Sequence, residues 1–327
     1  MARFPGEKHL NFFDNPTTDI DRYKNAFLVK GLNKDDKVFY YASANEKPAI
    51  DSNADQSVNA TFGESLLVET SYDEYTKNFE DYQAAFAKTE VNKAILSRPK
   101  IVEISSDYDL LAYFERLESA HPQALVYLLV HPTQGIWIGA TPEILLSRKE
   151  NQYTTVSLAG TQKISQSPYQ WGEKEKEEQE FVSAHIRESL HLNDIQNFTE
   201  TGPETVEAGS VAHLKSIFKF KRSEADFDYL HLVDHLHPTP AISGTPVSEA
   251  IELINATENH NRRLYTGYLG RISAQSIDLY VNLRCMQVFS TKMVLYLGGG
   301  ITQASELQAE WEETEHKAKT LLKQING

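Results

Sequence analysis

The chain has 327 residues, of which 40% are hydrophobic and 24% charged, and its formal net charge is −14. This length supports a sizeable core in one large domain or two ordinary ones, and the acidic balance argues against nucleic acid, whose phosphates require a basic surface. The single cysteine, Cys285, excludes an intramolecular disulfide, and no apolar run resembles a signal peptide or a membrane span. We therefore expect a cytoplasmic protein.

The spacing of apolar residues predicts the secondary structure. In chain order the predicted elements are a helix at 71–88, a strand at 93–104, two strands within 124–149, a strand at 152–161, a helix at 173–190, a helix before residue 237, a helix from 247, strands at 264–273, 276–289 and 292–302, and a helix at 304–323. Short polar turns join the last three strands, which predicts an antiparallel meander. Strands in runs and helices in blocks are typical of an α+β fold with large antiparallel β-sheets and helices packed outside. No low-complexity linker interrupts the chain, so we expect a single domain over 1–327.

Three histidines lie close together in the segment HLVDHLHP, at His231, His235 and His237. His231 and His235 are four residues apart, a spacing that can hold zinc on a helix. No fourth ligand or catalytic glutamate lies nearby, so histidines at an ordinary helix end are the favoured interpretation.

The predicted helix at 304–323 has four glutamates within six residues, 310–315. Glu310, Glu313 and Lys317 are spaced three and four residues apart and share one helix face. Glu312 and Glu315 point elsewhere, and we expect both to face water.

The helix at 173–190 places Glu178 on its apolar face, three, four and seven residues before Phe181, Val182 and His185. A carboxylate that faces a core is costly unless a cation meets it. Two interpretations stay open at this point. Glu178 is either a helix-edge carboxylate that reaches water, or half of a hard-cation site, because one carboxylate from each of two helices is a usual arrangement for Mg²⁺.

Nine short motifs carry a family resemblance. They are KAILSR (93–98), GATPEILL (139–146), LAGT (158–161), EKEKEEQEFV (173–182), HPTPAISG (237–244), RRLYTGYLG (262–270), NLRC (282–285), LGGGI (297–301) and EWEETEHK (310–317). In this order they resemble the chorismate-utilising enzymes, which include isochorismate, salicylate, anthranilate and aminodeoxychorismate synthases. The motif-bearing part is 91–327, and residues 1–90 match poorly.

The resemblance implies an Mg²⁺ site and a chorismate site. Glu178 and Glu313 match the two glutamates that hold Mg²⁺, which in turn holds the ring carboxylate of chorismate. Glu310 would either contact the two metal ligands from behind or reach the metal through a water molecule. The positions that match substrate-binding residues are Gly160, Thr161, Ala241, Tyr265, Arg284, Gly298, Gly300 and Lys317.

Among the family members, isochorismate synthase matches best. Lys93 matches the lysine of the members that deliver water to the ring, and Ala159 stands where aminodeoxychorismate synthases carry a nucleophilic lysine. The opening of the HPTPA motif with His-Pro is also similar to isochorismate synthases, whereas salicylate and anthranilate synthases usually begin it with Phe-Pro. Salicylate synthase and anthranilate synthase component I remain the alternatives. The chain departs from the family pattern at Ser157, Lys176, Gln179 and Gly299.

The implied reaction adds water at ring carbon 2 while the hydroxyl on carbon 4 leaves. It requires a base for the water and an acid for the leaving oxygen, and the resemblance assigns these roles to Lys93 and Glu143. Both need a pKa shifted toward the neutral form, which burial away from water would supply. We expect a monomer without an amidotransferase partner. Relatives use isochorismate for menaquinone and for catechol siderophores, and family breadth favours menaquinone.

Overall fold

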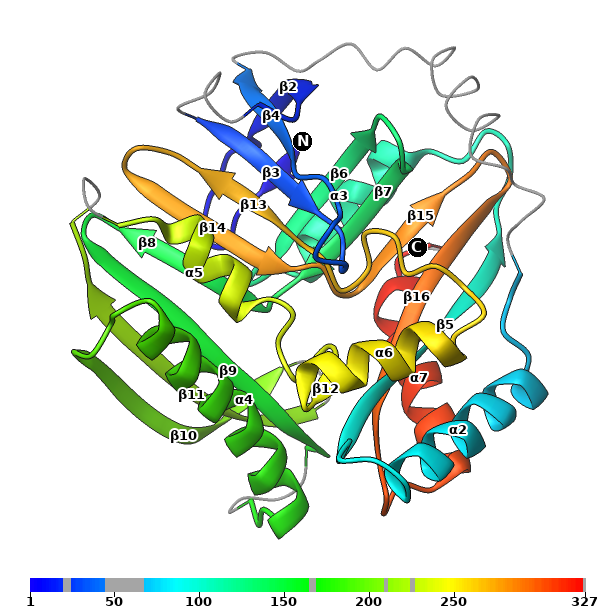
Figure 1. The fold of residues 1–327 in the computed structure, drawn as a ribbon. Helices are drawn as coiled ribbons and strands as arrows, with labels where there is room; N and C mark the ends of the chain where they lie inside the picture. Colours follow the sequence, from blue (N-terminus) through cyan, green and yellow to red (C-terminus); the bar gives the residue numbers. More distant parts are fainter. Residues whose placement is uncertain (20–24, 45–67, 165–168, 209–210, 224–226, 326–327) are drawn as a thin grey trace.

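Two antiparallel sheets form the centre of the molecule (Figure 1). The computed structural model describes all residues except 20–24, 45–67, 165–168, 209–210, 224–226 and 326–327. The first sheet has the order β1 (Ala2–Arg3), β6 (Leu125–His131), β7 (Gly135–Thr141), β15 (Cys285–Val288), β16 (Lys292–Thr302), β5 (Lys93–Glu103) and β12 (Gly244–Thr245). The second has the order β10 (Phe198–Ala208), β11 (Val211–Lys221), β9 (Gln152–Lys163), β8 (Ile144–Lys149), β14 (Ser276–Val281), β13 (Tyr268–Ile272), β3 (Ala26–Lys30), β4 (Phe39–Ala44) and β2 (Phe12–Thr17).

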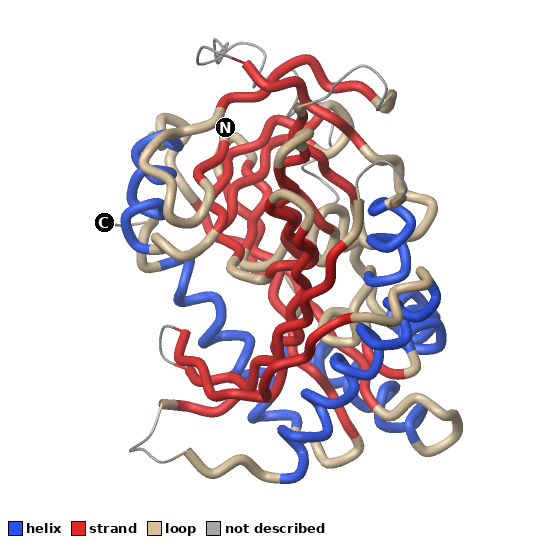
Figure 2. Tube along the Cα trace, turned by 90° about the vertical axis from the view of Figure 1, so that its left-hand side faces the viewer, coloured by secondary structure: helices blue, strands red, loops and turns tan. Residues whose placement is uncertain are grey.

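Helices cover the outer faces of these sheets, as the tube view in Figure 2 shows. The helices are α2 (Tyr72–Phe86), α3 (Leu110–Ala120), α4 (Glu173–Leu192), α5 (Tyr229–Leu236), α6 (Val247–Thr257) and α7 (Leu307–Leu322). One core cluster lies between the two sheets and joins Phe27 and Leu269 to Trp137 and Tyr296. A second packs α4 and α5 on the nine-stranded sheet, and a third packs α3 and α7 on the seven-stranded sheet. The α+β prediction with antiparallel sheets and outer helices is confirmed.

The predicted three-stranded meander is wrong, because the middle strand breaks at residues 282–284. Its first part, β14, pairs with β13 in the nine-stranded sheet, and its second part, β15, pairs with β16 in the seven-stranded sheet. At the break Arg284 has a φ of 49°, a left-handed conformation that a continuous strand cannot contain. The Asn282 side chain holds the break by accepting from Tyr127 Oη at 2.7 Å and donating to Leu264 O at 2.8 Å.

A second crossing between the sheets lies at Pro142–Glu143, where β7 ends and β8 begins. The sequence predicted two strands in this region, whereas the structure has three, because β8 continues in the other sheet. The two crossings lie side by side: Val281 N donates to Glu143 O at 2.9 Å, and Ala140 N donates to Arg284 O at 3.1 Å. Two predicted site residues, Glu143 and Arg284, therefore occupy neighbouring crossings.

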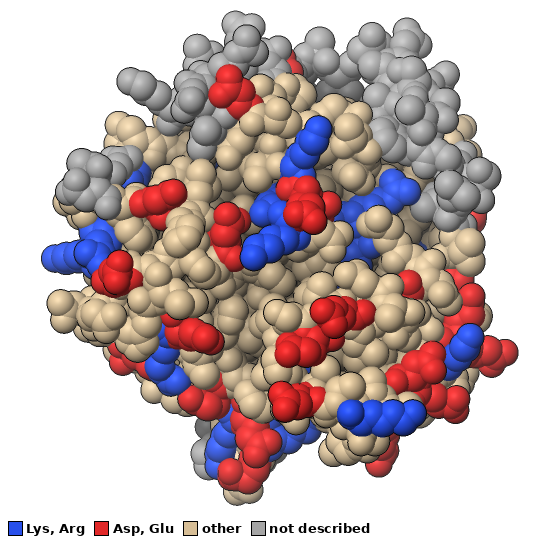
Figure 3. All heavy atoms as spheres, in the orientation of Figure 1, with Lys and Arg blue, Asp and Glu red and all other residues tan. Residues whose placement is uncertain are grey.

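The poorly matched first 90 residues contribute strands to both sheets. β1 pairs with β6, and β3 pairs with β13 in the middle of the nine-stranded sheet. Apolar periodicity did not predict α3 or the hairpin β10–β11. No helix of the described residues is long and apolar enough to cross a membrane. Figure 3 shows acidic side chains spread over one face of the molecule, with lysines and arginines interspersed among them.

Candidate active site

Glu143 and Arg284 lie at the two neighbouring strand crossings, and the charge of each acts on the pKa of the other. Burial raises the pKa of Glu143 to about 7, although the positive charges of Arg284, Lys317 and Lys93 oppose this shift. Burial also lowers the pKa of Arg284, and the charge of Glu143 opposes that shift. None of the described residues forms a hydrogen bond or ion pair with either side chain. The site therefore contains a carboxyl group that can carry a proton near neutral pH and a guanidinium available to an anion.

Lys93 begins β5 with a side chain that is only 6% exposed, and its Nζ lies 3.9 Å from Glu178 Oε2. Burial lowers its pKa, because the charged ammonium loses its hydration. The charges of Glu178 and Glu313 raise this pKa, whereas those of Lys317 and Lys174 lower it. The ammonium thus lies between α4 and α7, and both helices contribute charge of both signs.

The glycine triplet of β16 lets side chains approach the sheet closely from both faces. Gly298, Gly299 and Gly300 pair with Ser97, Leu96 and Ile95 of β5. A Cβ at Gly298 would lie 2.8 Å from Tyr265 Oη, and one at Gly300 would lie 2.8 Å from Lys93 Cε. On the opposite face, a Cβ at Gly299 would lie 3.1 Å from Glu310 Oε2 and 3.9 Å from Glu313 Oε1. The LGGGI motif therefore marks close approach to the backbone, and the strand continues beyond it to Thr302.

The carboxylates of α7 differ in their surroundings. Lys317 Nζ lies 2.8 Å from Glu313 Oε1 and donates to Gly298 O at 2.7 Å. The charge of Lys317 lowers the pKa of Glu313, whereas burial raises the pKa of Glu310, which accepts from Ser305 Oγ at 2.6 Å. Glu313 is thus held ionised at the sheet, beside a more deeply buried carboxyl group.

These acidic residues suit a Mg²⁺ ion that substrate and water would complete. Within the described part of the chain, no group of three or more His, Cys, Asp and Glu side chains is placed to hold a metal ion. Mg²⁺, however, is usually bound through one or two carboxylates together with waters and substrate oxygens. Glu178 of α4, whose Oε2 lies 3.9 Å from Lys93 Nζ, and Glu313 of α7, beside Gly299, are two such carboxylates. By residue type and number they fit the predicted ion.

The expectation for Glu315 is wrong, whereas Glu312 is exposed as predicted. Glu315 forms ion pairs with Arg98 and with Lys100, whose Nζ lies 3.0 Å from Glu315 Oε1. Arg98 is fully buried, and its guanidinium lies 3.8 Å from the ring centroid of Trp311. A buried guanidinium requires a counter-charge, so it recruits the glutamate of the packed helix face. This contact anchors α7, which carries Glu313.

The remaining predicted substrate positions lie in two segments. Gly160 has a φ of 65° at a register shift between β9 and β11, which is a β-bulge. Thr161 follows it in β9, and only its backbone is described. Ala241 is partly buried between α5 and β12 and packs on the core beneath α4, and no described contact joins it to the ionisable residues.

His213 is a site residue that sequence reasoning missed. Its Nδ1 lies 3.2 Å from Gly160 O. Burial lowers the pKa of His213, the charges of Arg284 and Lys317 lower it further, and the charge of Glu313 raises it. It lies on β11, a strand that the periodicity analysis did not identify. Its alternation with buried Ala212 and Leu214 gave no sign of a functional position.

The three clustered histidines are helix-end histidines, as favoured. His231 Nδ1 donates to Asn193 Oδ1 at 2.9 Å, and Asn193 Nδ2 donates to His235 Nδ1 at 3.0 Å. His237 Nε2 donates to Thr266 O at 2.8 Å. These hydrogen bonds join α5 to the end of α4 and to the loop before β13.

Comparison with known proteins identifies the family. A model of the family described as "Chorismate binding enzyme" matches residues 23–326. The chain belongs to this family. The chain is 26% identical over 279 residues to the isochorismate synthase EntC of Escherichia coli K12. This match covers 82% of this chain and 70% of that protein. It is also 26% identical over 267 residues to the vibriobactin-specific isochorismate synthase of Vibrio cholerae, covering 79% and 68% of the two chains.

The fold of this chorismate-binding enzyme is that of solved relatives. MenF, the menaquinone-specific isochorismate synthase of Escherichia coli, superposes with a TM-score of 0.75 at 20% identity, over 92% of this chain and 79% of that chain. The family match begins at residue 23, so it includes strands from the N-terminal part that the motifs did not reach.

Proposed function

We propose that this chorismate-binding enzyme is an isochorismate synthase, an isomerase that converts chorismate to isochorismate with Mg²⁺. The observation that carries the proposal is the pairing of a buried lysine, whose pKa is lowered, with a buried glutamic acid, whose pKa is raised to about 7. The addition of water needs a base and the loss of a hydroxyl needs an acid, and burial shifts the pKa of each group toward the form that its role requires. Its curated relatives with this activity support the same assignment.

Lys93 and Glu143 divide the proton transfers between them. Neutral Lys93 takes a proton from the water whose oxygen forms the new bond to ring carbon 2. The ring double bonds shift, the bond from carbon 4 to its hydroxyl breaks, and Glu143 donates a proton to the departing oxygen. One water enters and one leaves, so the ring is isomerised without net hydration. Burial lowers the pKa of the base and raises that of the acid, so it shifts each group toward the neutral form that the reaction requires.

The other residues bind and orient the substrate. The guanidinium of Arg284, which pairs with none of the described residues, suits a carboxylate of chorismate. Tyr265 Oη and Lys93 Cε lie against Gly298 and Gly300 on the same face of β16. When bound, Mg²⁺ would supply positive charge that holds the ring carboxylate, with Glu178 and Glu313 as its ligands. Because water is the nucleophile, we also propose that the protein works as a monomer without an amidotransferase subunit.

The direct test incubates purified protein with chorismate and Mg²⁺ and identifies the products. Isochorismate without pyruvate is the expected result. Salicylate with stoichiometric pyruvate would indicate a salicylate synthase, and a product formed only after ammonia is added would indicate an anthranilate synthase. Mg²⁺ binding without any chorismate turnover would indicate a binding protein and would contradict the proposal.

Glu313→Gln is expected to weaken Mg²⁺ binding by at least about tenfold, because it removes the charge of a proposed ligand. Mg²⁺ titrations of turnover, together with calorimetric binding of Mg²⁺ in the absence of chorismate, measure the change. Glu312→Gln is the matched control, since Glu312 lies one residue away on the same helix and is exposed. Equal Mg²⁺ affinities for the two variants would contradict the metal site.

Gly300→Ala is expected to lower turnover by about 10²-fold, because a new Cβ 2.8 Å from Lys93 Cε must displace the proposed base. Gly299→Ala is the matched control. Its Cβ would lie 3.1 Å from Glu310 Oε2 on the other face, away from Lys93, so the proposed base keeps its place and turnover should exceed that of Gly300→Ala. Steady-state kinetics of both variants provide the comparison, and a similar loss in each would argue that the triplet only stabilises the strand.

A further inference from the structure

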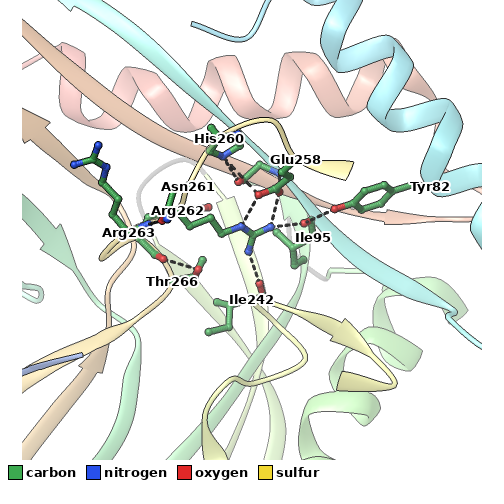
Figure 4. A network of polar contacts seen from close by, with 11 residues as sticks. Tyr82, Ile95, Ile242, Glu258, His260, Asn261, Arg262, Arg263 and Thr266 are labelled. Carbon is green, nitrogen blue, oxygen red and sulfur yellow. Dashed lines mark hydrogen bonds and ion pairs between the residues drawn. The ribbon is translucent and has the colours of Figure 1, made fainter. Parts of the chain in front are cut away.

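A buried ion pair outside the proposed catalytic residues lies beside β5, the strand that begins with Lys93 (Figure 4). Arg262 Nε donates to Glu258 Oε2 at 2.8 Å, and Arg262 Nη2 donates to Glu258 Oε1 at 2.6 Å. The side chains are 4% and 2% exposed. Burying two charges is costly, and a well-packed apolar pair would often stabilise a protein as well or better. Stability alone therefore gives a weak account of this pair.

The remaining hydrogen bonds of the pair go to backbone groups of separate segments. Arg262 Nη2 donates to Ile95 O at 2.6 Å, and Arg262 Nη1 donates to Ile242 O at 3.0 Å. Glu258 Oε1 accepts from Ser97 N at 2.7 Å. In Figure 4 the guanidinium lies between β5 and the segment that leads to β12. The pair thus ties a strand and a loop to the chain that precedes β13.

The pair continues the edge of the seven-stranded sheet where no strand is available. β12 pairs with β5 only at Lys93 and Ala94, and Ser243 O accepts from Ile95 N at 2.9 Å. Beyond that point the Ile95 carbonyl accepts a short hydrogen bond from Arg262 and a longer one, at 3.3 Å, from Tyr82 Oη, and the Ser97 amide donates to Glu258. Backbone groups left unpaired in a buried position would cost stability and would allow the strand to shift.

Each tied segment carries a residue of the proposed site. Lys93 lies two positions before Ile95 on β5, and Ala241 directly precedes Ile242. Tyr265 N donates to Arg262 O at 2.8 Å, so Arg262 also begins the turn that presents Tyr265. The base, the Ala241 loop and the Tyr265 hydroxyl are therefore held to one guanidinium–carboxylate pair.

We propose that Arg262 and Glu258 act as a positioning pair that sets the spacing of β5, the 237–244 loop and Tyr265 around bound chorismate. Neither residue touches the reacting atoms in this arrangement, because their polar atoms are directed at one another, at the backbone and, for Glu258 Oε2, at His260 Nε2 at 3.6 Å. The inference rests on the proposed function and names two further residues on which that reaction depends.

The test compares Arg262→Lys and Arg262→Ala with wild type at a temperature well below unfolding, with Mg²⁺ and chorismate. Lysine retains the charge but loses the fork that reaches Glu258 and two carbonyls at once. We expect both variants to raise KM for chorismate and to lower kcat, with a combined loss in kcat/KM of about 10²-fold. A cavity of about 310 Å³ is lined by Arg262, Glu258 and His260, so added guanidinium should restore part of the activity of Arg262→Ala.

Arg3→Ala is the matched control. Arg3 is also buried, lies 3.1 Å from Glu118 and donates to backbone carbonyls, but it ties β1 to the end of α3. We expect it to lower the melting temperature without changing KM, and guanidinium should not alter its kinetics. A wild type that does not convert chorismate would overturn the proposed function. A wild type that converts chorismate, beside an Arg262→Lys variant with unchanged KM and kcat, would overturn this inference alone.

Discussion

Lys93→Ala is expected to lower kcat for isochorismate formation by about 10³-fold while chorismate and Mg²⁺ still bind. General-base catalysis typically contributes 10²- to 10⁴-fold. The side chain is buried against Glu178, and its pKa is lowered, so a fraction of Lys93 is already unprotonated before substrate arrives. Single-turnover rates and calorimetric binding of chorismate separate the chemical step from binding.

Lys30→Ala is the control for Lys93→Ala. Lys30 and Lys93 are the buried lysines of the described chain. Lys30 lies outside the proposed site, and its Nζ is 3.3 Å from Asp234 Oδ1. Its removal should reduce stability but leave kcat within a few-fold of wild type. Turnover that survives Lys93→Ala would show that the base is assigned to the wrong residue.

Glu143→Gln is expected to lower kcat by about 10²- to 10⁴-fold, because the amide cannot protonate the departing hydroxyl. The same residue should produce the alkaline limb of the pH profile. A general acid must hold its proton, so kcat/KM should fall as pH rises through the Glu143 pKa of about 7. A base must lack its proton, so the rate should also fall as pH drops below the lowered pKa of Lys93.

The pH dependence distinguishes a catalytic Glu143 from a structural one. In Glu143→Gln the residual activity should lose its alkaline limb but keep the acid limb that Lys93 causes. In kcat the alkaline limb of the wild type should move to higher pH, because bound carboxylates of chorismate oppose ionisation of Glu143 and offset the charge of Arg284. An alkaline limb that persists in Glu143→Gln would assign that ionisation to another group.

Much of the fold and the chemistry could be predicted from local patterns. Helix 71–88 and the strand from Lys93 were identified from periodicity, because apolar side chains repeat at the spacing of the element that they bury. The motif order also predicted the family, since side chains that bind one ligand constrain short segments in a fixed sequence. Helix spacing placed Glu178 on the apolar face of its helix and Glu313 on one face with Glu310 and Lys317, and it was the family resemblance that implied their role as Mg²⁺ ligands.

Long-range contacts supplied what these patterns lacked. The strand propensity of 276–289 does not predict that the chain passes from one sheet to the other at Arg284, because β14 and β15 are equally suited to a sheet. The pairing of Glu315 with Arg98 joins residues 217 positions apart, and local spacing alone placed Glu315 in water. The pKa shifts of Lys93 and Glu143 likewise arise from burial by both sheets and two helices. Residue order thus specified which groups are present, whereas packing of distant segments set their hydration, their charge partners and hence their protonation.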